Sequence, residues 1–224
     1  MDFDCVVLAG GLSARLGGRP KSALTIGGTS LLQLTLGATP DARQTIVVGD
    51  PVGIPGIRSV REDPPFSGPA SAIAAGVDAL RTAGREPSPF TLVLACDMPG
   101  VASAVARLRA AAGRIGRSDG VIAVDAADHP QFLVGLYRTS ALVDAAVTHA
   151  GQLVDLSVRS LLDALTLVPV RIDDESTDDV DTWADAARFG VDQLAGPLDA
   201  ARRTPDAARP PHPHATPHHT TPRK

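Results

Sequence analysis

The chain alternates between short apolar runs and longer stretches in which alanine and leucine recur at helical spacing. Short continuous apolar runs are typical of strands buried on both faces, and the i, i+3, i+4 spacing between them indicates amphipathic helices. The predicted strands are Phe3–Leu8, Thr45–Val48, Thr91–Ala95, Gly120–Val124, Phe132–Tyr137 and Leu165–Ile172. The predicted helices are Ser30–Leu36, Pro69–Arg81, Ala102–Ala112, Thr139–Ala150, Val158–Ala164 and Asp179–Phe189. This order predicts an α/β fold with a single doubly wound, mainly parallel, Rossmann-like sheet and helices on both faces.

The pattern stops near residue 195. From Gly196 onward the chain holds seven of its 19 prolines and four of its 6 histidines, with no aromatic residue and no apolar periodicity. Such a segment buries too little apolar surface to offset the entropy lost on ordering. We therefore predict a folded domain over residues 1–195 and a disordered tail rich in proline and histidine over residues 196–224.

Composition narrows the class of protein. Apolar residues make up 44% and charged residues 21% of the 224, which is typical of a globular chain. No apolar run is long enough for a membrane span, and the acidic N-terminus does not resemble a signal peptide, so we expect a cytoplasmic protein without a membrane partner. The net charge of −4 gives no basic surface for nucleic acid. The two cysteines, Cys5 and Cys96, are too few for a disulfide framework.

A loop rich in glycine and cations follows the first predicted strand. It spans residues 9–21 and carries Arg15, Arg19 and Lys21. Glycines let backbone N–H groups approach a phosphate closely, and arginine and lysine add charge-assisted contacts. Lys21 also stands out because Lys224 is the only other lysine in the chain. We predict that this loop binds phosphate.

Two common phosphate-binding motifs do not fit this loop. A P-loop requires glycine directly before its Lys-Ser pair, but Arg19 and Pro20 separate Gly18 from Lys21. The dinucleotide fingerprint G-x-G-x-x-G fails too, because Gly10 and Gly11 are adjacent. The failure of this fingerprint argues against an NAD-dependent dehydrogenase.

The segment Leu8–Lys21 instead resembles the signature loop of nucleotidyltransferases related to molybdenum cofactor guanylyltransferase. Four further elements resemble motifs of that family in the same order, namely Glu62-Asp63 with Gly68-Pro69, Cys96-Asp97-Met98-Pro99, His129-Pro130, and Asp179-Val180-Asp181-Thr182. The resemblance covers everything but the tail. It implies a nucleotidyltransferase fold for the predicted domain.

The resemblance also implies an activity. The expected reaction transfers GMP from GTP to the terminal phosphate of a molybdopterin-type molybdenum cofactor and releases pyrophosphate. Lys21, Arg15 and Asp97 would be catalytic, and Asp97 with Asp181 would hold Mg²⁺, which prefers one or two carboxylates together with phosphate oxygens. The nucleotide-binding residues would be Leu8, Ala9, Gly10, Gly11, Arg15, Lys21, Asp63, Gly68 and Asp97.

The preference for guanine rests on the run Leu8-Ala9-Gly10-Gly11, which resembles the guanine-using branch of the family, because cytidine-using relatives more often read L-A-A-G here. The alternatives are a CTP-using molybdopterin cytidylyltransferase, a sugar-phosphate nucleotidyltransferase, and a non-catalytic nucleotide-binding protein that delivers cofactor. The expected partners are GTP and the molybdopterin-type cofactor as substrates, and a molybdoenzyme or its chaperone as recipient of the product.

Overall fold

The computed structural model describes residues 1–11, 20–172, 179–180 and 182–192, and these form a seven-stranded sheet as their main element. The strand order is β5 (Arg58–Val60), β4 (Thr45–Val48), β1 (Phe3–Leu8), β6 (Phe90–Ala95), β8 (Pro130–Arg138), β7 (Gly120–Val124) and β9 (Leu167–Arg171). Among these strands β8 alone runs antiparallel to its neighbours. The predicted fold class, with its mainly parallel sheet, is confirmed.

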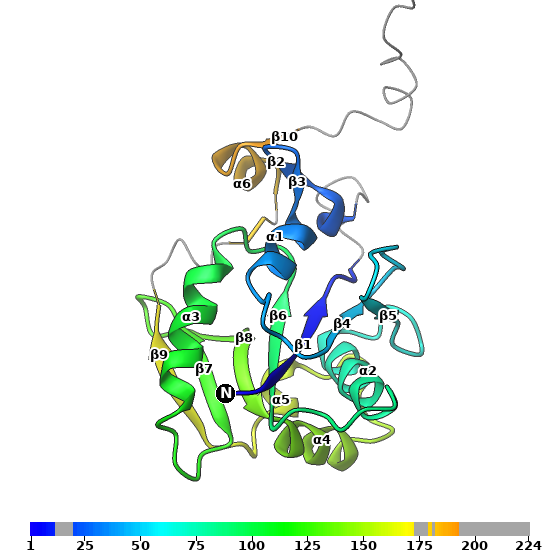
Figure 1. Cartoon of the computed structure of the whole chain (residues 1–224), viewed down its shortest axis with the longest axis vertical. Helices are drawn as coiled ribbons and strands as arrows, with labels where there is room; N and C mark the ends of the chain where they lie inside the picture. Colours follow the sequence, from blue (N-terminus) through cyan, green and yellow to red (C-terminus); the bar gives the residue numbers. More distant parts are fainter. Residues whose placement is uncertain (12–19, 173–178, 181, 193–224) are drawn as a thin grey trace, which may run out of the picture. The chain divides into compact units, whose positions relative to one another are not determined.

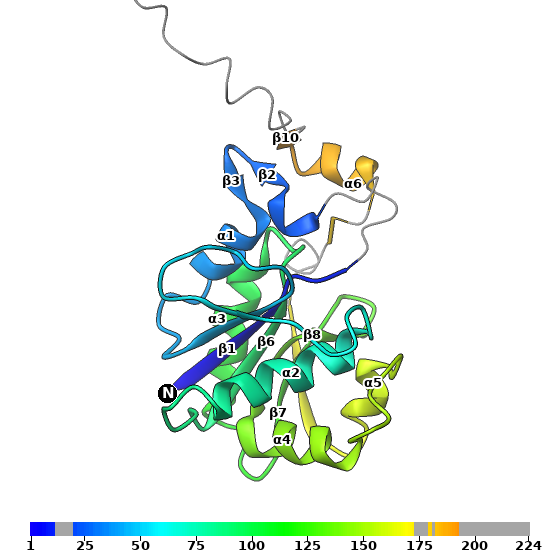
Figure 2. The same ribbon diagram turned by 90° about the vertical axis from the view of Figure 1, so that its right-hand side faces the viewer.

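Helices cover both faces of this sheet, as Figures 1 and 2 show. One face packs against α1 (Leu31–Gly37) and α3 (Val101–Ala112), and the other against α2 (Pro69–Arg81), α4 (Thr139–Thr148) and α5 (Val158–Leu161). The side chains of the central strand β1 point alternately to the two faces of the sheet, so the strand packs against both helix layers. Cys5 and Val7 pack on the α3 side, whereas Val6 and Leu8 pack on the α2 side. All six residues of β1 are buried, which explains why every one of them except Asp4 is apolar.

A second, three-stranded sheet lies beyond the carboxyl ends of the main strands (Figures 1 and 2). It consists of β10 (Val191–Asp192), β2 (Thr25–Ile26) and β3 (Thr29–Ser30), with α6 (Trp183–Arg188) beside it and the short 3₁₀ helix η2 (Lys21–Ala23) before it. Gly27 and Gly28 form the β2–β3 turn with φ of 56° and 81°, values that glycine adopts without strain. Strands of two residues leave too short an apolar pattern to be predicted.

The remaining differences from the predicted elements have local causes. Strand β5 is absent from the predicted elements, because only one of its three residues, Val60, is apolar and the strand lies at the sheet edge. Helix α6 begins at Trp183 rather than at Asp179, because Thr182 caps it and accepts a hydrogen bond from Asp185 N. The predicted tail over residues 196–224 lies outside the described residues and stays a prediction. Within the described ranges, no helix is long and apolar enough to cross a membrane.

A buried polar network closes the amino end of the sheet. The Asp4 carboxylate is fully buried and accepts hydrogen bonds from Ser88 N at 2.6 Å and from Ser88 Oγ at 3.0 Å. Thr139 Oγ1 donates to Ser88 O at 2.6 Å and lies 2.8 Å from Thr91 Oγ1. Because Asp4 pairs with Thr91 in the β1–β6 register, this network ties two central strands to the loop before β6.

Candidate active site

Two glycine turns meet at the carboxyl edge of the sheet. After β1 ends at Leu8, Ala9 N donates a hydrogen bond to Val48 O at 2.8 Å. Gly49, directly after β4, has φ of 150°, and a Cβ at this position would lie 2.9 Å from Ala9 C and from Gly10 N. Only glycine permits this approach, so the turn after β4 supports the first residues of the predicted phosphate loop. The position of a Cβ on Gly11 is open, with nothing within 4 Å.

Lys21 and Asp97 meet at this edge. Lys21 is the first residue of η2, and its Nζ donates a hydrogen bond to Asp97 Oδ2 at 2.8 Å. Asp97 follows β6 by two residues, so the pair joins the end of the phosphate loop to the end of a central strand. The two side chains are 21% and 18% exposed, which leaves them reachable from solvent but screened less than a surface pair. The structure thus brings together two of the three predicted catalytic residues.

The backbone around Asp97 is held from two sides. Cys96 N donates to Leu8 O at 3.1 Å, and Val180 N donates to Asp97 O at 3.0 Å. Asp181, the second predicted metal ligand, follows Val180 but lies outside the described residues, as does Arg15. Their predicted roles stay predictions.

The cysteine beside Asp97 is not a nucleophile. Burial raises the pKa of the Cys96 thiol to about 12, and the neighbouring Asp97 carboxylate adds to the rise. Burial also raises the pKa of Cys5 to about 12. Both thiols are therefore neutral near pH 7, and the chemistry of the site depends on its charged side chains.

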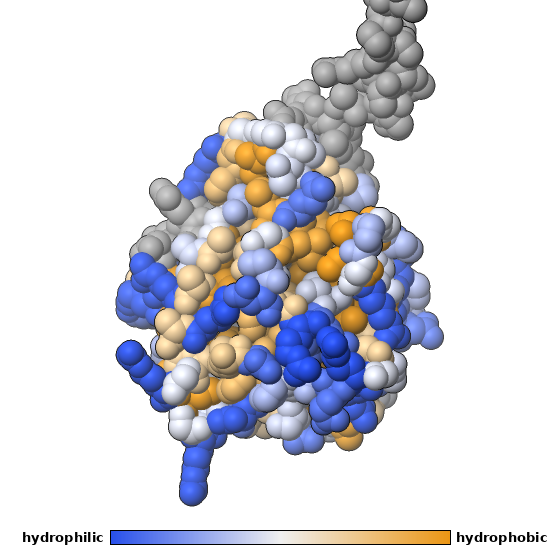
Figure 3. All heavy atoms as spheres, in the orientation of Figure 1, coloured by the Kyte–Doolittle hydropathy of each residue, from blue (hydrophilic) through white to orange (hydrophobic). Residues whose placement is uncertain are grey.

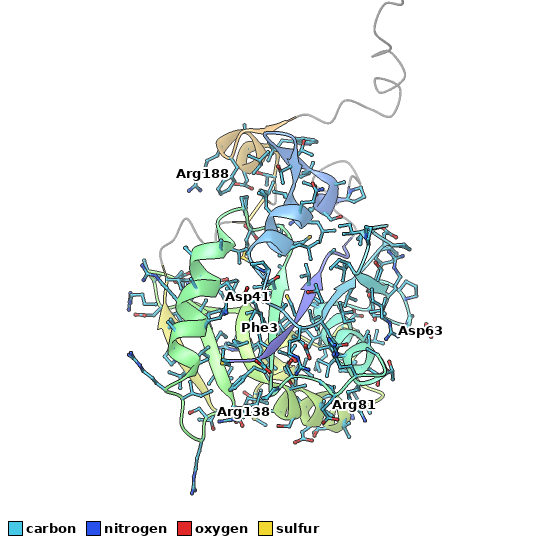
Figure 4. All side chains as sticks on the ribbon, viewed as in Figure 1. Phe3, Asp41, Asp63, Arg81, Arg138 and Arg188 are labelled. Atoms are coloured by element: carbon cyan, nitrogen blue, oxygen red, sulfur yellow. The ribbon has the colours of Figure 1, made fainter. Side chains whose placement is uncertain are left out.

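Two adjacent acids in the loop between β5 and α2 differ in their exposure to solvent. Glu62 is 8% exposed, and its Oε1 accepts a hydrogen bond from Phe66 N at 2.9 Å. Asp63, which the family motif predicts to bind nucleotide, is exposed, and Figure 4 shows it at the outer margin of the molecule. Gly68, also predicted, ends this loop as the N-cap of α2 with φ of 94°. Sequence reasoning missed the inward acid and Phe66, because adjacent residues in a loop carry no periodicity that separates them.

A third loop at this edge displays His129. The Asp125 carboxylate directly after β7 accepts hydrogen bonds from His129 N at 2.8 Å and from Ala127 N at 2.9 Å. Both hydrogen bonds lower the pKa of Asp125, and the bond from His129 N is the largest cause. The His129 side chain is 75% exposed, and its Nδ1 lies 3.3 Å from Asp125 Oδ2. Because β8 starts here between β6 and β7, the loop lies on the other side of Asp97 from β4 and β5.

Among the described residues, Asp97 is the candidate ligand for a divalent cation at this site. No group of three or more His, Cys, Asp or Glu side chains there could by itself hold a metal ion. Asp97 nevertheless offers a partly exposed carboxylate at a strand end, and Mg²⁺ is often held by one or two carboxylates with the rest of its shell from phosphates and water. The arrangement therefore fits a cation that arrives with a phosphate ligand.

Fold and site together define a nucleotidyltransferase-type α/β protein. The sheet is mainly parallel, and a glycine turn, a lysine and an aspartate converge at its carboxyl edge. Residues 5–169 match the model of the MobA-like NTP transferase domain, and the chain belongs to this family. It is a nucleotidyltransferase.

Solved structures support this fold. Molybdopterin-guanine dinucleotide biosynthesis protein A from Archaeoglobus fulgidus aligns with a TM-score of 0.64 at 23% identity, over 84% of this chain and 96% of that chain. A homologue of Mycobacterium tuberculosis Rv0371c from Mycobacterium sp. strain JC1 aligns at 0.62 and 26% identity, over 84% and 94% of the two chains. The 2-C-methyl-D-erythritol 4-phosphate cytidylyltransferase from Thermus thermophilus aligns at 0.62 and 18% identity, over 85% and 98%. No curated protein sequence matches the chain.

Proposed function

We propose that this nucleotidyltransferase transfers GMP from GTP to the terminal phosphate of a molybdopterin-type molybdenum cofactor. The observation that carries the proposal is the contact of Lys21 Nζ with Asp97 Oδ2 at 2.8 Å, beside the glycine turn after β1. The run Leu8-Ala9-Gly10-Gly11 in the first family motif favours guanine. The product would pass to a molybdoenzyme or its chaperone in the cytoplasm.

The reaction needs positioning and charge neutralisation rather than a general base. A terminal phosphate oxygen of the acceptor forms a bond to the α-phosphorus of GTP, and the bond from that phosphorus to the bridging oxygen of the β-phosphate breaks. The electron pair leaves with pyrophosphate. Because the attacking oxygen is already anionic, the barrier is lowered by cations and N–H donors that are held in place before reaction.

Each group at the carboxyl edge has a role in this scheme. The Lys21 ammonium offsets negative charge on the phosphates. The N–H groups of Gly10 and Gly11 bind phosphate oxygens, whereas the N–H of Ala9 is already bonded to the β4 backbone and holds the turn in place. Asp97 would hold Mg²⁺, which supplies charge neutralisation between phosphate oxygens when bound. The contact between Lys21 and Asp97 keeps both side chains oriented before substrate arrives.

The remaining predicted residues complete the proposed site. Arg15 is a second cation, Asp181 is a second metal ligand, and Leu8, Asp63 and Gly68 belong to the nucleotide site. The geometry favours Gly68 over Asp63, because Gly68 ends its loop at a helix N-terminus whereas the Asp63 side chain lies at the margin of the molecule.

A melting panel tests the donor nucleotide. The protein is heated with each of the four ribonucleoside triphosphates and Mg²⁺, and a ligand present at a hundred times its dissociation constant stabilises the fold by about 2.7 kcal/mol. We expect the largest rise in melting temperature with GTP. A larger rise with CTP would support a cytidylyltransferase instead, an activity named for the Thermus thermophilus structure of similar fold.

A pyrophosphate assay then tests transfer. We expect pyrophosphate release from GTP and Mg²⁺ only when a molybdopterin-type acceptor is added. Release with a sugar phosphate would redirect the assignment to another nucleotidyltransferase. Binding of GTP without release in the presence of any acceptor would favour a protein that only carries nucleotide and cofactor.

A further inference from the structure

The loop between β5 and α2 holds an exposed aromatic ring in an unusual backbone conformation. Phe66 is 51% exposed, and its φ is 63°. A bulky residue other than glycine rarely occupies this left-handed region, because its Cβ crowds the backbone. Such strain persists where surrounding contacts fix it, and it concentrates at ligand-binding sites.

Glu62 is the contact that fixes this conformation. Its side chain is almost fully buried, and Oε1 accepts the hydrogen bond from Phe66 N at 2.9 Å. Burying a carboxylate is costly unless it is hydrogen-bonded, and the Phe66 N–H supplies such a bond. The outward position of the ring is therefore set by the loop, and the ring is not a core residue left uncovered.

A cation links this ring to the glycine turns. The Arg61 guanidinium carbon lies 5.2 Å from the centroid of the Phe66 ring, and Arg61 Nη2 donates to Asp50 Oδ1 at 2.5 Å. Asp50 follows Gly49, whose backbone is pressed against the turn after β1. The guanidinium covers one face of the ring while half of the residue is still exposed. The ring is therefore available for stacking and is positioned relative to the phosphate loop.

The residues directly after Phe66 offer hydrogen bonds. Ser67 is 3% exposed, yet its Oγ has no hydrogen-bond partner within the described part of the chain. Gly68 is then the N-cap of the 13-residue helix α2, and it supplies no side-chain cap to the N–H groups of the first turn. A stacking ring, an unpartnered hydroxyl and a helix N-terminus thus follow one another. This set suits a planar heteroaromatic ring that carries hydrogen-bonding edges.

We propose that Phe66 stacks on the nucleobase of the nucleoside triphosphate and thereby contributes to its binding affinity, an inference that rests on the proposed function. The loop lies on the β4–β5 side of the Lys21–Asp97 pair and is joined to the phosphate loop through Asp50. A triphosphate anchored at that pair can extend its nucleoside toward Phe66. The acceptor then approaches from the opposite side, where β8 and β7 meet.

Binding measurements on the full chain test the proposal. Dissociation constants of GTP with Mg²⁺ are measured by calorimetry for wild type, Phe66→Ala and Phe66→Trp, and again with inorganic tripolyphosphate, which lacks a base. Stacking of a base on an aromatic side chain predicts that Phe66→Ala weakens GTP binding about 5- to 100-fold. Tripolyphosphate binding stays unchanged, and Phe66→Trp retains GTP. Val147→Ala, which truncates an apolar residue 64% exposed on α4, is the matched control and leaves both constants unchanged.

Other outcomes overturn the inference in distinguishable ways. Wild-type binding of GTP together with unchanged binding in Phe66→Ala refutes stacking and leaves the proposed function intact. A parallel loss of tripolyphosphate binding shows that the substitution disturbs the phosphate loop, and it overturns stacking as the cause of weaker GTP binding. If wild type binds no nucleoside triphosphate, the proposed function itself fails.

Discussion

The two ends of the main sheet treat a carboxylate in opposite ways. At the amino end, Asp4 is fully buried and its oxygens accept hydrogen bonds from the backbone and side chain of Ser88. At the carboxyl end, Asp97 is partly exposed and contacts the long, flexible side chain of Lys21. Figure 3, drawn in the orientation of Figure 1, shows apolar surface in the upper half of the molecule, where the central strands have their carboxyl ends. One acid is committed to the fold, whereas the other stays open to a ligand.

The difference follows from what each end must do. Asp4 lies within β1, where the backbone is fixed on both sides, so donors from the loop before β6 can satisfy it permanently. Asp97 follows its strand by two residues, in the region where parallel strands of α/β proteins bind ligands. An acid that is to hold a cation cannot have all of its oxygens bonded within the protein. The comparison therefore predicts activity losses at one end and stability losses at the other.

The largest expected effect is on turnover at the carboxyl end. Lys21→Ala and Asp97→Asn should each lower kcat at least about 10²-fold, the scale of losing one preorganised electrostatic group. The melting temperature should change little, since a partly exposed ion pair contributes about 1 kcal/mol or less. Steady-state pyrophosphate release and thermal melts measure the two quantities. Lys224→Ala, which removes the only other lysine in the chain, is the control and should keep full activity.

Near-normal turnover in either variant would remove the proposed roles of Lys21 and Asp97. A large loss of stability with normal turnover would mean that the two ends of the sheet do not differ as argued.

The next effect is on stability at the amino end. Asp4→Ala leaves the N–H and the hydroxyl of Ser88 without their acceptor in a buried site, which should cost about 2 kcal/mol. The kcat of the folded protein should stay normal, because the network lies at the far end of the strands. Urea unfolding gives the free energy, and the activity assay at low temperature gives kcat. Asp2→Ala, on an exposed residue before β1, should change neither.

The sequence predicts much of this scaffold but not the contacts of the site. The pattern predicts helix α2 from Pro69 to Arg81 with both ends correct, because proline starts it and alanine fills its buried face. Strand β1 is also predicted correctly, since burial on both faces makes all of its residues except Asp4 apolar. Both Lys21 and Asp97 can be singled out from their motifs. Their contact at 2.8 Å spans 76 positions of the chain and depends on how the strands pair.

Local choices within loops are the part that sequence patterns miss. Of the adjacent acids Glu62 and Asp63, the family motif points to Asp63, yet it is Glu62 that turns inward to hold Phe66. A distant segment also holds this loop, because Asp155 N donates a hydrogen bond to Ser67 O at 2.9 Å. No short-range periodicity encodes such a contact between distant segments.

A substitution in the glycine turn can sharpen the comparison further. Gly49→Ala places a Cβ 2.9 Å from the backbone of Ala9 and Gly10 at a φ of 150°, so the two turns must move apart. We expect a loss of about 1–2 kcal/mol in unfolding free energy together with weaker triphosphate binding. Gly113→Ala, where nothing lies within 4 Å of the added Cβ and φ is negative, is the matched control. Unchanged GTP affinity in Gly49→Ala would show that the first turn keeps its shape without this support.

The smallest effect concerns acid at the His129 loop. The pKa of Asp125 is lowered in the folded protein, first by the hydrogen bond from His129 N, so its ionised form favours the fold. That contribution is present above the unfolded-state pKa of about 3.9 and is lost as pH falls through the lower, folded-state value. Asp125→Asn should therefore have a melting temperature that falls less steeply than wild type between about pH 5 and pH 3. An unchanged slope in Asp125→Asn would assign the acid sensitivity to other groups of the protein.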